Sequence, residues 1–265
     1  MHISSLHYYP IKGCRGHSVQ RAEFDAHGVI DDRRLMVVDA QSRFVSQREA
    51  AELATVEPTL EGNRLTARCD GRSPLVLELD PEGVERQVSI WGSTLLAADQ
   101  GDPAAEWFSS VVGSPVRLVR WSRHSHRAID PTYTPRHGAE TAFTDGYPAL
   151  IVLEASLADL NTRLDIPVPI GRFRPNIVVQ GGAAWSEDHW HAVSIGAMTF
   201  DAVKPCARCV VTTTDQRTGA RHPHQEPLRT LATFRTMPHL GAIFGQNLVH
   251  RAPGTVAIGD PVITM

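Results

Sequence analysis

Short runs of apolar and β-branched residues, separated by glycine, proline and acidic residues, recur along the chain of 265 residues. Such runs are typical of strands, whereas helices need a longer repeating pattern. We expect strands at or within residues 2–9, 34–39, 44–46, 53–57, 65–68, 75–79, 87–91, 115–121, 149–153, 172–180, 191–200 and 255–265. Patterns typical of helices are confined to residues 102–113, 228–235 and 156–164, the last with Ser156 as the expected N-cap. The sequence therefore predicts a mainly β (α+β) protein with few helices.

The segment from Val203 to Asp215 contains two of the four cysteines, Cys206 and Cys209. Lys204 and the proline after it are typical of a loop, and the β-branched run 210–214 predicts a strand behind the thiols. Cations beside a thiol favour the thiolate, which is the form that binds metals and attacks electrophiles. Lys204 and Arg208 are the cations that we expect to act on these two sulfurs.

The residues alone leave three interpretations of this pair open. A structural zinc site needs four ligands, and the chain has no second C-x-x-C pair, because Cys14 and Cys69 stand alone. A thioredoxin-like redox pair precedes a helix, whereas β-branched residues follow here. The third interpretation is two half-buried cysteines of a β domain, since free cysteine is commonly buried.

Lysine is rare in this chain. Only two of the 26 basic residues are lysine, and they are Lys12, in a glycine-rich basic loop over residues 12–16, and Lys204, beside the cysteines. An ammonium group is a compact point charge, and glycine-rich backbone presents N–H groups to anions. This distribution favours one anion-binding site that uses both halves of the chain.

Several motifs together resemble the MOSC family, which is named after the C-terminal part of molybdenum cofactor sulfurase. In the second half these are Arg172-Phe173-Arg174-Pro175-Asn176, Cys206-Ala207-Arg208-Cys209 with Thr212, Thr213 and Asp215, Phe244-Gly245-Gln246-Asn247, and Gly259-Asp260-Pro261-Val262. The first half resembles the β-rich domain before MOSC in the mitochondrial amidoxime-reducing component and its bacterial relatives, through Tyr9-Pro10-Ile11-Lys12-Gly13-Cys14-Arg15-Gly16, Asp32-Arg33-Arg34 and Trp91-Gly92. The resemblance implies a smaller N-terminal β-rich domain over residues 1–120 and a MOSC-type β-barrel domain over residues 121–265.

The same resemblance implies a molybdenum–molybdopterin cofactor, with the thiolate of Cys209 as the metal ligand. The family positions for contacts with the phosphate and pterin fall on Lys12, Gly13, Arg33, Arg48, Arg172, Arg174, Asn176, Thr212 and Thr213. Cys209, Asp145 and Arg208 are the implied catalytic positions. The family often has serine where Gly13 stands, so a backbone N–H would replace a hydroxyl contact there.

The reaction implied by the resemblance is the two-electron reduction of N-oxygenated compounds such as hydroxylamines and amidoximes. We expect a separate flavin or iron–sulfur reductase as electron donor, because the chain lacks the C-x4-C-x2-C motif of a plant-type ferredoxin domain. A non-catalytic carrier of the molybdenum cofactor or of sulfur is the alternative function.

Composition excludes several other classes. The net charge of −3 gives no electrostatic footprint for nucleic acid, and no apolar run reaches the length of a membrane span. The N-terminus lacks the features of a signal peptide, and four cysteines give no disulfide framework. We therefore expect a cytoplasmic protein with neither nucleic acid nor membrane as a partner.

Overall fold

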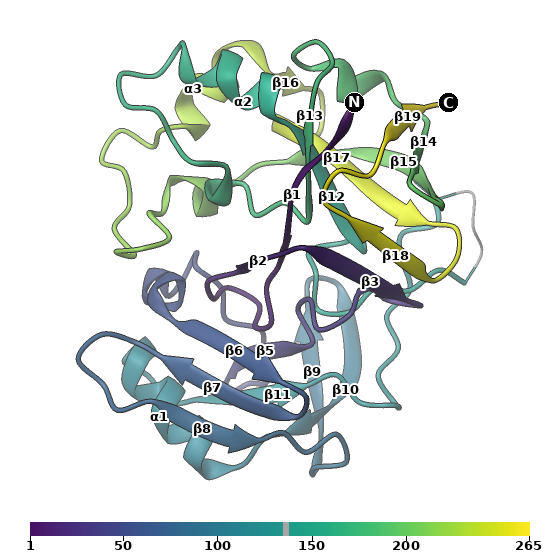
Figure 1. The fold of residues 1–265 in the computed structure, drawn as a ribbon. Coiled ribbons are helices and arrows are strands. Elements are labelled where there is room, and N and C mark those ends of the chain that lie inside the picture. Colours follow the sequence, from purple (N-terminus) through teal and green to yellow (C-terminus); the bar gives the residue numbers. More distant parts are fainter. Residues whose placement is uncertain (135–137) are drawn as a thin grey trace.

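A computed structural model describes residues 1–134 and 138–265 and shows two lobes, one above the other in Figure 1. Within the described residues, the upper lobe contains a nine-stranded sheet in the order β19-β14-β15-β17-β12-β13-β1-β2, with β16 beside β17. Its strands are β1 (His2–Tyr8), β2 (His17–Val19), β12 (Ala149–Leu153), β13 (Ile177–Gln180), β14 (Ala192–Ile195), β15 (Met198–Ala207), β16 (Thr236–Met237), β17 (Gly241–His250) and β19 (Val262–Thr264). The predicted mainly β class is confirmed.

Three smaller sheets complete the described part of the chain. A three-stranded sheet packs in the upper lobe: β18 (Gly254–Ala257), β3 (Arg21–Asp25) and β4 (Gly28–Val29). The lower lobe contains a four-stranded sheet of β5 (Leu35–Asp39), β11 (Val116–Arg120), β10 (Ser93–Asp99) and β9 (Glu85–Ile90). The last sheet is β6 (Glu57–Glu61), β7 (Arg64–Arg68) and β8 (Leu75–Glu78), which lies beside α1 (Asp102–Val112).

The two lobes are not two consecutive pieces of the chain. Strand β1 pairs antiparallel with β13, with Leu6 opposite Ile177, and β3 pairs with β18. Strands β1, β2 and β3 therefore belong to the upper lobe, while the loop after β1 reaches the lower lobe, where Ile11 and Cys14 pack in its core. The boundary at residue 120 remains a prediction.

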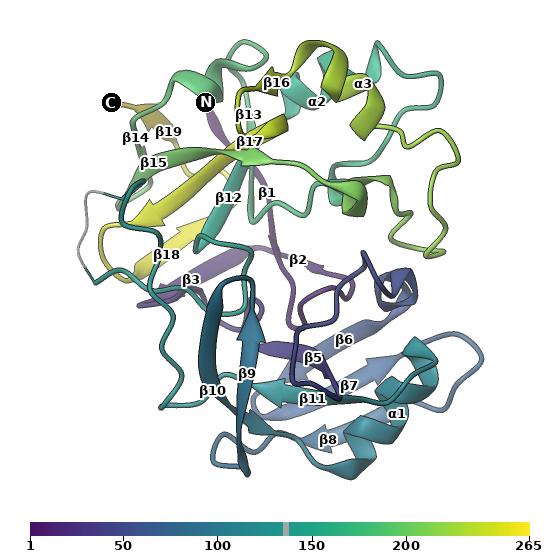
Figure 2. The same cartoon turned by 180° about the vertical axis from the view of Figure 1, so that it is seen from behind.

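Each lobe has an apolar core. Phe24, Phe200 and Val256 belong to the core between the nine-stranded sheet and the β18-β3-β4 sheet. A second upper core includes Leu160 of α2 (Glu154–Asn161) and Leu231 of α3 (Leu228–Phe234). These helices cover one end of the large sheet, as Figure 2 shows from behind.

The strongest local patterns are found where they were predicted. The continuous apolar run of β12 is buried along its whole length and pairs with β13 in parallel and β17 in antiparallel orientation. Helix α1 follows Gly101, has a proline in its first turn, and ends at Gly113, whose φ of 77° is readily adopted by glycine. Helix α3 also lies within its predicted range.

Five local predictions were wrong. Residues Val210–Thr213 form a 3-10 helix, η4, rather than a strand. Of residues 44–46, Phe44 makes an isolated bridge to Val38, and residues 51–55 form a second 3-10 helix, η1. The C-terminal stretch is divided into β18 and β19 by a turn. Ser156 does not cap α2, because its buried hydroxyl donates to Glu187 Oε2 at 2.8 Å from within the helix.

None of the helices in residues 1–134 and 138–265 combines the length and apolar character needed to cross a membrane.

Close packing of β17 on β12 generates a stability prediction. Gly245 has a φ of +76°, and an added Cβ would lie 2.5 Å from Val152 Cγ1 and 2.8 Å from the carbonyl oxygen of Ile151. Backbone strain and overpacking both oppose a side chain there. We expect Gly245→Ala to lower the free energy of unfolding by about 3 kcal/mol in urea titrations. Gly171→Ala is the control, because nothing lies within 4 Å of its Cβ position. Equal stability of the two variants would contradict this packing.

Candidate functional site

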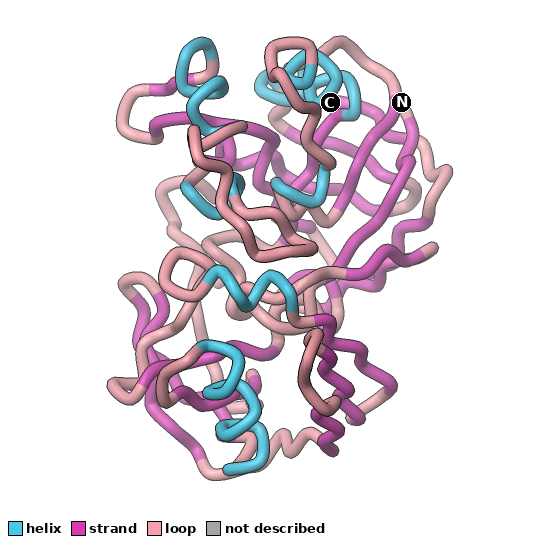
Figure 3. Tube along the Cα trace, turned by 90° about the vertical axis from the view of Figure 1, so that its left-hand side faces the viewer, coloured by secondary structure: helices cyan, strands magenta, loops and turns pink. Residues whose placement is uncertain are grey.

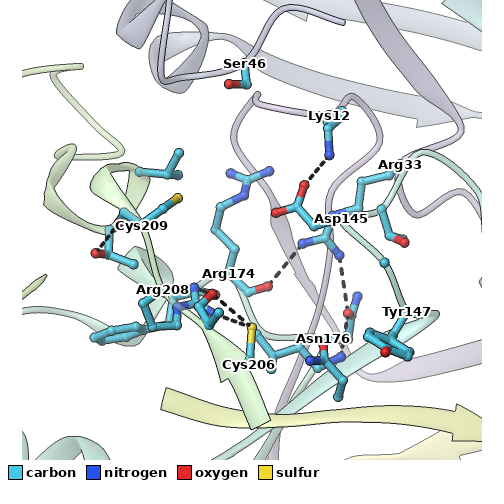
Figure 4. Close-up of a pocket in the computed structure, with 18 of the residues that line it drawn as sticks. Lys12, Arg33, Ser46, Asp145, Tyr147, Arg174, Asn176, Cys206, Arg208 and Cys209 are labelled. Carbon is cyan, nitrogen blue, oxygen red and sulfur yellow. Dashed lines mark hydrogen bonds and ion pairs between the residues drawn. The ribbon is translucent and has the colours of Figure 1, made fainter. Parts of the chain in front are cut away.

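A pocket of about 260 Å³ has walls from both lobes and collects most of the predicted site residues (Figure 4). The predicted residues that line it are Lys12, Gly13, Arg33, Arg48, Asp145, Arg174, Asn176, Arg208, Cys209 and Thr212. Arg172 and Thr213 are not among the lining residues.

Each thiol of the pocket has its own guanidinium. Arg48 Nη2 lies 3.1 Å from Cys209 Sγ, and Arg208 Nη1 lies 2.8 Å from Cys206 Sγ. Of the two cations expected to act on these sulfurs, Arg208 contacts Cys206, whereas the guanidinium at Cys209 is that of Arg48. Arg208 also donates to the carbonyl oxygen of Phe173 at 2.7 Å, which keeps it on the Cys206 side. Figure 4 shows the two sulfurs at different places on the wall.

Arg48 is held in place by three groups besides the sulfur. Its guanidinium carbon lies 4.6 Å from the ring centroid of Trp91, a cation–π arrangement. Arg221 donates to the backbone oxygens of Gln47 at 2.8 Å and of Arg48 at 2.5 Å. Ser46 Oγ accepts from the backbone N–H of Arg48 at 3.1 Å. A residue of the lower lobe is thereby fixed against the Cys209 thiol of the upper lobe.

Lys12 and Asp145 form a close ion pair. The Nζ–Oδ1 distance is 2.5 Å, and Lys12 is buried while Asp145 stays open to the pocket. Desolvation lowers the pKa of Lys12 to about 8, although Asp145 opposes this shift. Enclosure tends to raise the pKa of Asp145, but Lys12 outweighs it and holds this pKa below its usual value. The carboxylate therefore remains ionised, and the lysine, with its pKa of about 8, is charged below that pH.

Arg33 and Arg174 share the ring of Tyr9, whose centroid lies 4.2 Å from each guanidinium carbon. Arg33 donates to Asp32 at 2.6 Å and to Asn176 Oδ1 at 3.3 Å. Arg174 donates through Nη1 to the carbonyl oxygen of Cys14 at 2.7 Å, while its buried Nη2 has no partner among the described residues. Burial and the charge of Arg33 lower the pKa of Arg174 to about 10. Arg174 thus retains a free donor at the pocket.

Arg172 and Thr213 act behind the pocket wall. Arg172 donates to the carbonyl oxygen of Thr213 at 2.8 Å and to Asp215 at 3.2 Å. Thr212 Oγ1 donates to the carbonyl oxygen of Cys209 at 2.9 Å, and Thr213 Oγ1 donates to that of Val210 at 2.7 Å. These hydroxyls close the turn of η4 that begins next to Cys209, which explains why the β-branched run is not a strand.

The sequence did not identify several lining residues. Gln47 donates to the carbonyl oxygen of Gly13 at 2.6 Å and to Gln216 Oε1 at 2.9 Å, so it fixes the Lys12 loop. Gly13 itself has a φ of +87°. Ser46 and Tyr147 also line the pocket. The available signal was that these residues lie within two positions of Arg48 or Asp145 in the sequence.

Comparison with known proteins identifies two domains in the chain. Residues 1–115 match the MOSC N-terminal beta barrel domain, and residues 138–263 match the MOSC domain, which is a molybdenum-cofactor-binding domain. The chain is 34% identical to mitochondrial amidoxime-reducing component 1 of Mus musculus, over 98% of this chain and 81% of that protein. Identity to the component 1 of Homo sapiens is 33%, over 98% and 82%.

A more distant relative is the molybdenum cofactor sulfurase of Oryza sativa subsp. japonica. It is 29% identical over 89% of this chain, which corresponds to 31% of the sulfurase. The two domain matches and the nearly full-length likeness to the amidoxime-reducing components show that this chain belongs to the MOSC family, in its two-domain form with the N-terminal beta barrel domain.

Proposed function

We propose that the pocket binds the molybdenum cofactor and that the protein reduces N-oxygenated compounds with electrons from a separate protein. The observation that carries this proposal is the arrangement at Cys209: an accessible thiol, with a guanidinium N–H at 3.1 Å, opens into the same pocket as the free donor of Arg174. The relatives named amidoxime-reducing components support the reaction type.

The donor set fits an anionic cofactor that is rich in sulfur. Arg174 Nη2 is buried and unpaired among the described residues, which suits a phosphate oxygen. Lys12 and the positive-φ loop at Gly13 lie on the same pocket. A soft thiolate suits a metal whose other ligands are sulfur and oxygen. Cys209 would hold the metal, and Lys12, Gly13, Arg33, Arg174 and Asn176 would lie around the phosphate and pterin.

Bound molybdenum cofactor would supply the two-electron removal of oxygen from nitrogen, with two protons consumed and water released. Arg48 would donate its N–H to the sulfur of Cys209 and keep this ligand in one position. Arg208 would set the position of Cys206 and of the wall behind it. The ionised carboxylate of Asp145 can accept a hydrogen bond from a substrate N–H and so orient the substrate.

Arg172, Thr212 and Thr213 would support Cys209 through the backbone of η4 and not through contact with the cofactor. We propose that Asn176 also acts mainly by supporting the pocket wall. Its side-chain amide is already hydrogen-bonded to the backbone of Leu150 in β12 and of His7 in β1. All four cysteines are free, which is compatible with the cytoplasm as the proposed compartment.

A carrier of the molybdenum cofactor or of sulfur is the second candidate function. Likeness to a molybdenum cofactor sulfurase favours it, as does the accessible Cys206 with its own guanidinium partner. Turnover of an N-hydroxy compound by the loaded protein separates the two functions, because a carrier has none.

The first functional prediction separates the two cysteines. Dithiolene and oxo ligands leave one place for protein sulfur, so Cys209→Ser should abolish reduction and change the absorption spectrum of the metal site. Cys206→Ser, the matched control, should keep the spectrum and much of the activity. Identical behaviour of the two variants would indicate that the thiols act as one redox or zinc unit.

The second prediction concerns Lys12, which neutralises Asp145 beside the proposed phosphate. Lys12→Ala should reduce cofactor affinity by an order of magnitude or more, because a charge-assisted hydrogen bond contributes roughly 1.5–3 kcal/mol and an unpaired carboxylate remains. Adding Asp145→Asn should recover part of this loss. Molybdenum and pterin content after gel filtration measures both effects. An Asp145→Asn change that gives no recovery would contradict the charge argument.

The affinity for the cofactor should also depend on pH, because it depends on the charge of Lys12. The pKa of Lys12 is lowered to about 8, so its charge is present below that pH and is lost above it. Affinity of the empty protein for the cofactor should therefore fall as pH rises through about 8, and Lys12→Met should remove this decline. A wild-type affinity that stays constant between about pH 7 and pH 9.5 would argue against the role of Lys12.

The third prediction is that electrons come from a flavin or iron–sulfur reductase. Purified loaded protein should reduce an amidoxime with a chemical reductant such as reduced methyl viologen, but not with NADH or NADPH alone. Direct turnover with NADH or NADPH in the absence of any other protein would contradict a separate donor.

A further inference from the structure

The two lysines of the pocket differ in how their charge is balanced. Lys12 is buried and paired with Asp145 at 2.5 Å. Lys204 is half-buried, and no carboxylate within the described residues lies close enough to form an ion pair with it. Its Nζ lies instead 3.8 Å from the ring centroid of Tyr133. Lys204 therefore places an ammonium group at the pocket. A cation–π contact with Tyr133 stabilises this group, and no carboxylate of the described residues neutralises it through an ion pair.

The position of Lys204 is fixed by the sheet. It lies in β15 two residues before Cys206, and Asn247 of β17 donates to its backbone oxygen at 3.0 Å. Lys204, Asn247 and Tyr147 all line the pocket that contains Cys209. Figure 4 shows Tyr147 on the wall beside Asn176, away from Cys209. Besides the thiol of Cys206, the pocket wall thus includes an ammonium group and an aromatic ring.

We propose that Lys204 selects substrates in which the N-oxygenated group is carried by a flat ring that also bears an anionic group. This inference rests on the proposed function and names its substrate class. The ammonium of Lys204 would pair with a carboxylate or phosphate, and the ring of Tyr147 would contact the flat part of the substrate. Tyr133 would act as a positioning residue that holds the ammonium in place.

Asp130 is an acidic group whose charge interacts with that of Lys204, and it would oppose the binding of an anionic substrate there. It is exposed, and its Oδ1 accepts from the backbone N–H of Thr132 at 3.0 Å. Its pKa is lowered chiefly by the hydrogen bonds from Thr132 and to a smaller extent by the charge of Lys204. Asp130 therefore weakens the attraction of Lys204 for an anion without forming an ion pair with it. Removing this carboxylate provides a variant with the opposite expected effect.

The experiment compares matched substrates with the loaded protein and a chemical reductant. Benzamidoxime and 4-carboxybenzamidoxime form the carboxylate pair, and N4-hydroxycytidine and its 5′-monophosphate form the phosphate pair. Lys204→Met should lower the preference for the anionic member, measured as the ratio of kcat/KM values, by about tenfold. Asp130→Asn should raise it by about twofold. The loss in Lys204→Met should appear in KM, because the contact is remote from the reacting nitrogen.

Equilibrium binding supplies a readout that needs no turnover. Calorimetry with 4-carboxybenzamidine and benzamidine should show the same loss of discrimination in Lys204→Met, at unchanged molybdenum content. An unchanged preference in both assays, or loss of the cofactor from Lys204→Met, would overturn the assignment of Lys204 to substrate. If no N-hydroxy compound is reduced but the binding preference follows Lys204 and Asp130, the proposed reaction fails and the anion site stands. The pair that shows the larger preference identifies whether carboxylate or phosphate is the recognised group.

Discussion

The pairing of β1 with β13 is the constraint on which the pocket depends, and Asn176 joins the two strands to a third. Its backbone N–H and side-chain Oδ1 bond to the backbone of Leu150 in β12, and its Nδ2 donates to the carbonyl oxygen of His7 in β1. The amide is almost completely buried, so these bonds are made without competition from water. As a result the loop after β1, with Lys12, faces the segment before β13, with Arg174. Figure 3 shows from the side the two lobes and the loops that lie between them.

Local charge balance explains how so many cations share one pocket. Most of them have a partner of their own, as in Lys12 with Asp145, Arg33 with Asp32, Arg48 with Cys209 and Arg208 with Cys206. These pairs fix the side chains before any ligand binds, which is the preorganisation that an anion site requires. Among the described residues, Nη2 of Arg174 and Nε of Arg208 are buried without a hydrogen-bond partner, and the ammonium of Lys204 lies over the ring of Tyr133 with no carboxylate in ion-pair contact. These groups are therefore available to bind an anionic ligand in the pocket.

The sequence predicted the elements whose signals are local. The buried run of β12 and the helix between Gly101 and Gly113 are examples, because a continuous apolar run and a glycine cap act on their own neighbours. Propensity failed at Val210–Thr213, where two threonine hydroxyls bond back to carbonyl oxygens and close a 3-10 turn. The partner of Cys209 could not be predicted from spacing, because Arg48 lies 161 residues away while Arg208 is adjacent. The pocket was thus predicted as a set of residues, but its pairwise contacts depend on the assembled lobes.

Anomalous diffraction at the molybdenum edge, on crystals of the protein loaded with its cofactor, tests the account most directly. We expect one molybdenum peak within bonding distance of Cys209 Sγ, with Arg48 still donating to that sulfur and the cofactor phosphate at Nη2 of Arg174. A peak bonded to Cys206 instead, or a phosphate bound away from Arg174, would contradict the assignment of the pocket.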